Sequence, residues 1–355
     1  MKEGSTLDVL AAELMRREKA KQDLVVDTRQ IEARVIEQED GTQAARLALA
    51  GLDIAPAPMP VTPHAHRQLG SKLGVPAKFY DRLLADYPSL WTDTINTIAH
   101  GQPSRNMLRT LDGHVRAVLS DRYRRVDNED VAGAVLPALL GDSDATIASC
   151  EVTDSRLYIK ALWPKTEQQV KVGDAVQAGV VISNSEIGSG SLKVEPLIYR
   201  LVCTNGMVVA DRRWRQFHVG AIVADVDGVA LRSETQAAQD KALMLTLVDM
   251  LKAARDTFGQ SVEKLRAAAD SQPIEKPIKA IEILAKRTGL TQAEGESVLE
   301  RLIRDKDYSK YGAANAVTNL ANDVDSYDRA SELEVIGGNV IDLSSTDWRQ
   351  IAEAA

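Results

Sequence analysis

Apolar and polar residues alternate along the middle of the chain, from about residue 105 to residue 210, and apolar residues recur every three or four positions on either side. A period of two is typical of strands, and the wider spacing is typical of amphipathic helices. Turn dipeptides such as Asp112-Gly113 separate the alternating runs, which favours antiparallel hairpins. The pattern therefore predicts an α+β fold: a hairpin-rich antiparallel sheet with flanking helices and a helical C-terminal region.

Prolines and changes of period divide the chain into three predicted parts. Residues 1–50 have a thin apolar stripe among charged positions, so we expect a helical arm there. The prolines between residues 51 and 63 indicate a linker. The predicted parts are an arm with its linker (1–60), an α+β core (61–232) and a C-terminal helical region with an acidic end (233–355).

The C-terminal region has the clearest helical signal. An apolar stripe spaced by three and four runs from Leu243 to Leu265, which predicts one helix of roughly 30 residues with Gly259 as a possible kink. Thr291 followed by Glu294 predicts a capping box at the start of a shorter helix.

The first hairpin brings cations together on one predicted face. A two-residue turn at Asp112-Gly113 would set Arg109 directly opposite Arg116. Like charges in that position cost roughly 0.2–1 kcal/mol, so an anion lying across them would explain the pair. Phosphate suits this role because a guanidinium presents a planar fork of donors. Nearby carboxylates, from Asp121 or the acidic C-terminal end, would explain the pattern equally well.

Cations and aromatic rings recur in two later segments. Arg156, Tyr158 and Lys160 are predicted to share one face of a second hairpin, with the apolar residues between them on the other face. Residues 212–218 interleave arginines with Trp214 and other rings. Cations beside stacking platforms are what single-stranded nucleic acid requires. For residues 212–218, the alternative is a basic loop with a buried Trp214.

Net charge points away from nucleic acid, but its distribution does not. The 355 residues carry 43 Lys and Arg against 51 Asp and Glu, a net charge of −8. Residues 105–125 nevertheless contain six Arg and two Asp, and residues 199–218 contain four Arg and one Asp. Because binding is local, two basic windows can hold phosphates within an acidic chain.

Signals for catalysis, cofactors and metals are weak. Gly188 and Gly190 lie in a strand-turn-strand context rather than before a helix, so no phosphate loop is predicted. Cys150 and Cys203 have neither metal-ligand spacing nor enough partners for a disulfide framework. The sequence shows no transmembrane run and no secretory signal. We therefore expect a non-enzymatic, cytoplasmic protein without cofactor, metal or membrane partner.

The predicted DNA-binding residues combine cations for phosphates with Tyr158 and Trp214 as stacking platforms. They are Arg105, Arg109, Arg116, Arg122, Arg124, Arg125, Tyr158, Lys160, Arg212, Arg213, Trp214 and Arg215. Reversing Arg109 and Arg116 to Glu is expected to abolish binding and leave the fold intact.

Four segments of the chain carry a family resemblance. They are HAHRQLGSKLGVPAKFYDRL (residues 64–83), RTLDGHVRAVLSDRYRRVDN (109–128), YRLVCTNGMV (199–208) and YGAANAVT (311–318). Together they resemble a phage- and plasmid-borne family known as domain of unknown function 932, over roughly residues 61–350. The resemblance implies no established activity.

The expected architecture more remotely resembles phage single-strand annealing proteins of the Red-beta, RecT and Erf kind. That resemblance implies a homo-oligomer, a ring or helical filament, that holds DNA strands in a basic groove without a nucleotide cofactor. The leading hypothesis is therefore a single-stranded DNA-binding and strand-annealing protein of a phage or plasmid, acting in ATP-independent homologous recombination. The alternative is a protein-interaction or host-modulating factor of a mobile element, whose arginine face meets an acidic protein. A third hypothesis is a metal-dependent nuclease.

Overall fold

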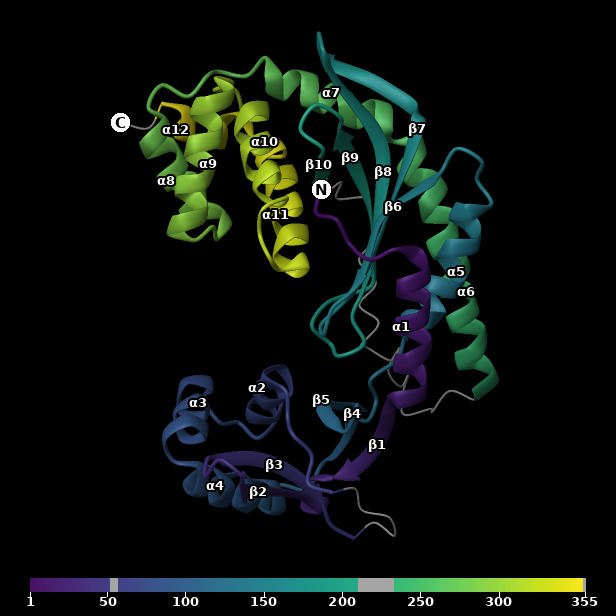
Figure 1. Cartoon of the computed structure of the whole chain (residues 1–355), viewed down its shortest axis with the longest axis vertical. Coiled ribbons are helices and arrows are strands. Elements are labelled where there is room, and N and C mark those ends of the chain that lie inside the picture. The colour runs from purple at the N-terminus through teal and green to yellow at the C-terminus, as the bar shows by residue number, and fades with distance from the viewer. Residues whose placement is uncertain (52–56, 210–232, 354–355) are drawn as a thin grey trace.

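The chain forms two lobes joined along one side, and the computed structural model describes residues 1–51, 57–209 and 233–353 (Figure 1). The small lobe contains β1 (Gln22–Asp27), β2 (Ile31–Glu37), β3 (Gln43–Leu49), α2 (Pro63–Lys72), α3 (Ala77–Asp86), α4 (Pro88–Gly101), β4 (Arg105–Leu111) and β5 (His114–Ser120). Its strands form a three-stranded sheet in the order β1-β4-β5 and a separate hairpin of β2 and β3.

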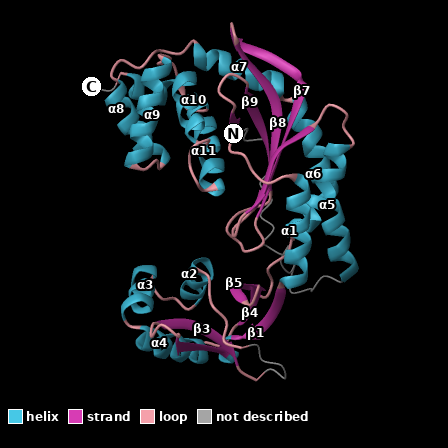
Figure 2. Cartoon of the chain, viewed as in Figure 1, coloured by secondary structure: helices cyan, strands magenta, loops and turns pink. Residues whose placement is uncertain are grey.

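The large lobe is built on a five-stranded antiparallel sheet with helices on both faces (Figure 2). Its helices are α1 (Leu7–Ala20), α5 (Asn128–Leu140), α6 (Ser233–Asp256), α7 (Phe258–Ala269), α8 (Pro277–Thr288), α9 (Gln292–Asp305), α10 (Lys310–Leu320), α11 (Tyr327–Ile341) and α12 (Ser345–Ala352). Its strands are β6 (Thr146–Val152), β7 (Leu157–Lys171), β8 (Asp174–Asn184), β9 (Lys193–Arg200) and β10 (Asn205–Val208), which pair in sequence order. The predicted α+β class is confirmed.

The two faces of the large sheet differ in chemistry. Leu157, Ile159 and Ala161 of β7 belong to the main apolar core, which also includes residues of α5, α6 and α7. Tyr158 and Lys160 alternate with them and so lie on the opposite face, toward α11. The predicted division of the second hairpin into a polar and an apolar face is therefore confirmed.

The expected helical arm is wrong beyond residue 20. Residues 22–27, 31–37 and 43–49 are strands instead, and the described part of this region is helical at Leu7–Ala20 and in a short 3-10 turn at Thr28–Gln30. Ile31 and Ala33 are buried on one side of β2, so the apolar stripe had a period of two. Whether the chain divides at residues 60 and 232 stays a prediction, because packing alone does not report independent folding.

The first hairpin has its predicted turn but not its predicted register. Asp112 and Gly113 both have positive φ, 51° and 73°, as the two-residue hairpin turn requires. A β-bulge between Arg109 and Thr110 shifts the pairing, so Arg109 lies opposite Ala117 and not opposite Arg116. The expectation of two directly opposed arginines is therefore wrong.

The C-terminal helices follow the predicted pattern with one break. The long apolar stripe is divided into α6 and α7, which are separated at Thr257, two residues before the proposed kink. The Thr291–Glu294 capping box at the start of α9 is confirmed. Among the helices of the described residues, none combines the length and apolar character that crossing a bilayer demands.

Candidate functional site

Burial sorts the predicted DNA-binding residues into three groups. Four are buried, namely Arg109, Arg116, Tyr158 and Lys160. Four keep part of the side chain at the surface, namely Arg105, Arg122, Arg124 and Arg125. Four fall outside the described residues, namely Arg212, Arg213, Trp214 and Arg215. We call the second group the arginine rim.

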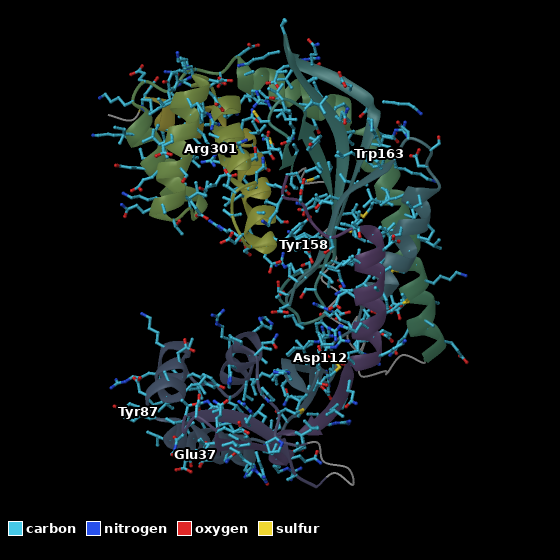
Figure 3. All side chains as sticks on the ribbon, in the orientation of Figure 1. Glu37, Tyr87, Asp112, Tyr158, Trp163 and Arg301 are labelled. Carbon is cyan, nitrogen blue, oxygen red and sulfur yellow. The ribbon has the colours of Figure 1, made fainter. Side chains whose placement is uncertain are left out.

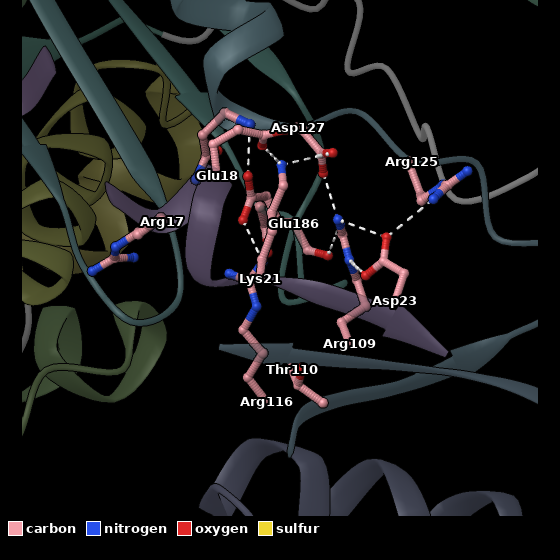
Figure 4. Close-up of polar contacts among 12 residues, drawn as sticks. Arg17, Glu18, Lys21, Asp23, Arg109, Thr110, Arg116, Arg125, Asp127 and Glu186 are labelled. Atoms are coloured by element: carbon pink, nitrogen blue, oxygen red, sulfur yellow. Dashed lines mark hydrogen bonds and ion pairs between the residues drawn. The ribbon is translucent and has the colours of Figure 1, made fainter. Parts of the chain in front are cut away.

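Arg109 lies in β4 where the two lobes meet (Figure 4). Its guanidinium donates to the carboxylate of Asp23 in β1 at 2.8 and 3.2 Å, and to that of Asp127 at 2.6 Å. It also donates to the backbone carbonyl of Glu186 at 2.9 Å. Because Asp127 immediately precedes α5 and Glu186 follows β8, Arg109 links the small lobe to the large lobe.

The neighbouring charges favour the ionised forms of both Asp127 and Arg109. Burial alone would raise the pKa of the Asp127 carboxyl, but Arg109 and then Lys21 lower it below its ordinary value. Burial likewise opposes the charge of Arg109, yet Asp127 and Asp23 raise the pKa of its guanidinium. Reversing Arg109 to Glu would set a third carboxylate against Asp23 and Asp127, so we now expect that change to unfold the protein.

Arg116 makes a second link between the lobes. It pairs with the buried carboxylate of Glu186 at 2.7 Å. The other oxygen of Glu186 accepts the backbone N–H of Asn128 at 2.7 Å, which fixes the carboxylate at the start of α5. In this arrangement the guanidinium of Arg116 faces protein carboxylate and not solvent. We call Asp23, Arg109, Arg116, Asp127 and Glu186 the arginine junction.

Asp127 of the junction and two neighbouring carboxylates gather as metal ligands would. Within the described ranges, the oxygens of Glu18, Asp127 and Glu129 come within 4.8 Å of one another. The ammonium of Lys21 lies among them, 2.9 Å from Asp127 and also paired with Glu18 and Glu129. Burial, and then a hydrogen bond shared with Glu18, raise the pKa of Glu129 to about 7. Because Lys21 supplies the positive charge, the cluster lends no support to the nuclease hypothesis.

The arginine rim borders a surface cavity of about 360 Å³. Met107, Tyr123, Arg124 and Arg125 line it, together with residues of β1 and of the first turns of α6. Arg124 donates to Asp240 of α6 at 2.8 Å, and Arg125 pairs with Asp23 at 3.2 Å. The carboxylates that pair with Arg124 and Arg125 therefore come from α6 and β1, rather than from the acidic C-terminal end.

Lys160 is buried between the polar face of the large sheet and α11. Its ammonium lies 2.6 Å from the carboxylate of Glu334 in α11, and both side chains are fully buried. It also lies 4.8 Å from the ring centre of Tyr327, whose ring contacts that of Tyr158 at 5.3 Å between centres. Burial raises the pKa of the Glu334 carboxyl, and Lys160 opposes that shift.

Tyr158 differs from Lys160 because it lines a second cavity, whose other lining residues come mainly from the strands of the large sheet and from α11. Figure 3 labels Tyr158 on the large sheet. This cavity is also about 360 Å³ in volume, and Arg156, Lys193 and Glu334 are among its lining residues. We call it the sheet–helix cavity. None of the residues of the arginine junction is among its lining residues.

These features define a two-lobed α+β protein whose lobes are linked by buried arginine–carboxylate pairs. The chain belongs to the family described as Domain of unknown function (DUF932), which matches residues 115–334, more than half of the sequence. No curated protein is significantly similar to the chain. No solved structure is significantly similar to it either.

Sequence reasoning missed the carboxylates that define the junction. Asp23 lies 86 residues from Arg109, and Glu334 lies 174 residues from Lys160, so no spacing rule connects them. A partial signal was present at Asp127, because an aspartate before an apolar helical run is a typical N-cap position. Nothing comparable marked Glu334, which sits in the middle of α11.

Proposed function

We propose that this protein binds single-stranded DNA through the arginine rim and promotes strand annealing without ATP. The carrying observation is that Arg124 and Arg125 line one surface cavity with Tyr123, while Arg105 and Arg122 are exposed in the neighbouring sequence. Exposed guanidinium groups beside an aromatic ring suit a strand whose phosphates and bases are both accessible. The buried arginines have a different role in this proposal, which is to hold the rim in place.

Carboxylates around the rim do not prevent phosphate binding, because each of their ion pairs is open to water on one side. Arg125 is 58% exposed against 14% for its partner Asp23, and Asp240 is 48% exposed against 23% for its partner Arg124. Pairs of this kind contribute about 0–1 kcal/mol, so an incoming phosphate can replace the carboxylate at little cost. Arg109 and Lys160 cannot exchange partners in this way, since their side chains are fully buried.

Salt dependence distinguishes this proposal from general stickiness. Each phosphate neutralised on a single strand contributes about 0.7 to the slope of log affinity against log salt concentration. Four rim arginines therefore predict a slope of about −3, and the double variant Arg122→Gln, Arg125→Gln should reduce its size by about 1.4.

The test is fluorescence anisotropy with a labelled 30-nucleotide strand. The matched control is Arg34→Gln with Arg304→Gln, which removes the same charge from two arginines that are 54% and 63% exposed elsewhere. We expect weaker, less salt-sensitive binding for the rim variant alone. Equal binding by both double variants would remove the rim from the proposal.

Strand annealing further implies a homo-oligomer, as a ring or filament, and this part of the proposal has its own test. Native mass spectrometry with and without the oligonucleotide should show higher-order species. A monomer in both conditions would restrict the proposal to strand binding.

A protein partner is the second candidate for the same surface. Val25 is 49% exposed and lines the rim cavity beside Asp23 and Asp121, so the surface mixes apolar, acidic and basic groups. Mixed surfaces of that kind are typical of protein interfaces. If no oligonucleotide binds at low salt, capture of an acidic protein by wild type but not by the rim variant would favour this candidate.

A further inference from the structure

The sheet–helix cavity carries chemistry that the arginine rim does not use. It lies between the polar face of the large sheet and α11, and its volume of about 360 Å³ falls within the range of small-ligand sites. In the register of the sheet, Tyr158 of β7 is paired with Ser183 of β8, which is paired with Lys193 of β9. These three side chains therefore form a polar row across one wall of the cavity.

Two buried polar groups in the cavity lack partners. Glu334 is fully buried, and while one carboxylate oxygen is held by Lys160, the other has no hydrogen-bond partner. Ser331, one turn earlier on α11, is also buried, and its hydroxyl is likewise unpartnered. Buried polar atoms are nearly always hydrogen-bonded, so an unpartnered acceptor and hydroxyl on two residues that line the cavity point to a ligand.

The remaining walls restrict what that ligand is. Val181, Val208 and Val335 provide apolar surface beside the Tyr158 ring. Arg156 donates to the backbone carbonyl of Ser189 at 2.7 Å, and Lys193 lies 3.7 Å from Glu195, so both cations keep further donors. Arg329 adds a third cation to the lining, and Glu195 and Glu332 add carboxylates. A matching ligand has an N–H donor for Glu334, a flat body for the apolar walls, and an anionic group for the cations.

We propose that the sheet–helix cavity binds one nucleotide, either free or as a unit of single-stranded DNA. The base edge donates to the open oxygen of Glu334, and Ser331 adds a second hydrogen bond. The phosphate lies toward Arg156 and Lys193. This inference deepens the proposed function and rests on it for the case in which the nucleotide belongs to a strand.

The open carboxylate oxygen predicts a base preference. Cytosine, adenine and guanine each present an exocyclic amine, which a glutamate can accept. The N3–H of thymine is flanked by two carbonyl oxygens, which repel a carboxylate. We therefore expect dCMP to bind at least about fivefold more tightly than dTMP, which corresponds to the lower end of one good base contact.

The experiment measures binding of dCMP and dTMP by isothermal titration calorimetry, and of dC30 and dT30 strands by anisotropy. Ser331→Leu fills the cavity and removes an unpartnered buried hydroxyl, so it should abolish dCMP binding without lowering the melting temperature. Ser89→Leu, at an exposed position of α4, is the control. Val335→Phe blocks the same cavity if Ser331→Leu fails to fold.

The outcomes separate the cavity from the rim. Loss of dCMP binding in both cavity variants, with dC30 preference also lost, supports a cavity that takes a base of the strand. Loss of dCMP binding with unchanged dC30 binding supports a site for free nucleotide. If dCMP does not bind wild type and Ser331→Leu leaves strand binding unchanged, the inference is overturned while the proposed function stands. If dCMP binds but no strand does, the proposed function fails and the cavity site stands.

Discussion

Replacing Arg109 with Met should destabilise the protein by about 3 kcal/mol, because it removes the cation of a buried ion-pair network. The side chain of Arg109 is fully buried, while those of its partners Asp23 and Asp127 are 14% and 19% exposed. Removing one member of a buried pair generally costs about 3–5 kcal/mol. The residual exposure lets water hydrate the two carboxylates in part, which places the expected cost near the lower limit.

Urea unfolding followed by circular dichroism measures this cost. Arg125→Met is the matched control, because Arg125 pairs with the same Asp23 but is 58% exposed, so the change should cost about 0–1 kcal/mol. Both variants leave Asp23 in place, and Arg109 differs from Arg125 in its burial and in its further bonds to Asp127 and the Glu186 carbonyl. Equal costs for the two variants would refute the structural role of Arg109.

Acid should reduce the difference between wild type and Arg109→Met. The folded-state pKa of Asp127 is lowered, chiefly by Arg109 against the opposing effect of burial. A carboxyl with a lowered pKa contributes stability that is present above its unfolded value, about 3.9, and is lost as pH falls through its folded value. The two unfolding curves should therefore converge below about pH 4.

Three further predictions concern stability. Gly338→Ala should be strongly destabilising by thermal melting, because a Cβ there would lie 1.7 Å from the carbonyl of Val208, whereas Gly259→Ala, with open space around it, should be neutral or stabilising by up to about 1 kcal/mol. Burial lowers the pKa of His66 to about 4, so wild type should lose stability as pH falls from about 6.5 to 4, and His66→Gln should lose less. Burial and a shared hydrogen bond raise the pKa of Glu129 to about 7, so the contribution of Glu129 to folding stability becomes less favourable as pH rises from about 4.5 to 7. Relative to wild type, Glu129→Gln should therefore gain stability between pH 5 and pH 8. A constant difference in unfolding free energy across that range would contradict the raised pKa.

Local features of the fold were predictable because local chemistry determines them. The Asp112-Gly113 turn follows from residues that adopt positive φ at low cost. The division of β7 into polar and apolar faces follows from alternation alone. Strands β2 and β3 were missed because alanines and exposed charges weaken their period of two, and their burial depends on packing against other elements of the small lobe.

The candidate site was only partly predictable, since burial of a charge depends on distant residues. The basic window was visible in the sequence. No nearby residue showed, however, that Arg109 is buried in ion pairs with Asp23 and Asp127 while Arg125 stays at the surface. The bulge beside Arg109 also changed which residue it faces. A count of charges therefore located the region, and the tertiary contacts determined which arginines remain open to a ligand.

The sharpest test of single-strand binding by the arginine rim compares a labelled 30-nucleotide strand with the same sequence as duplex, each titrated with wild-type protein at 50 and 200 mM salt. We predict binding that favours the single strand and weakens by about 50-fold between the two salt concentrations, as four phosphate contacts require. Absence of binding even at 50 mM salt would contradict the claim and make the arginine rim a surface for protein contacts.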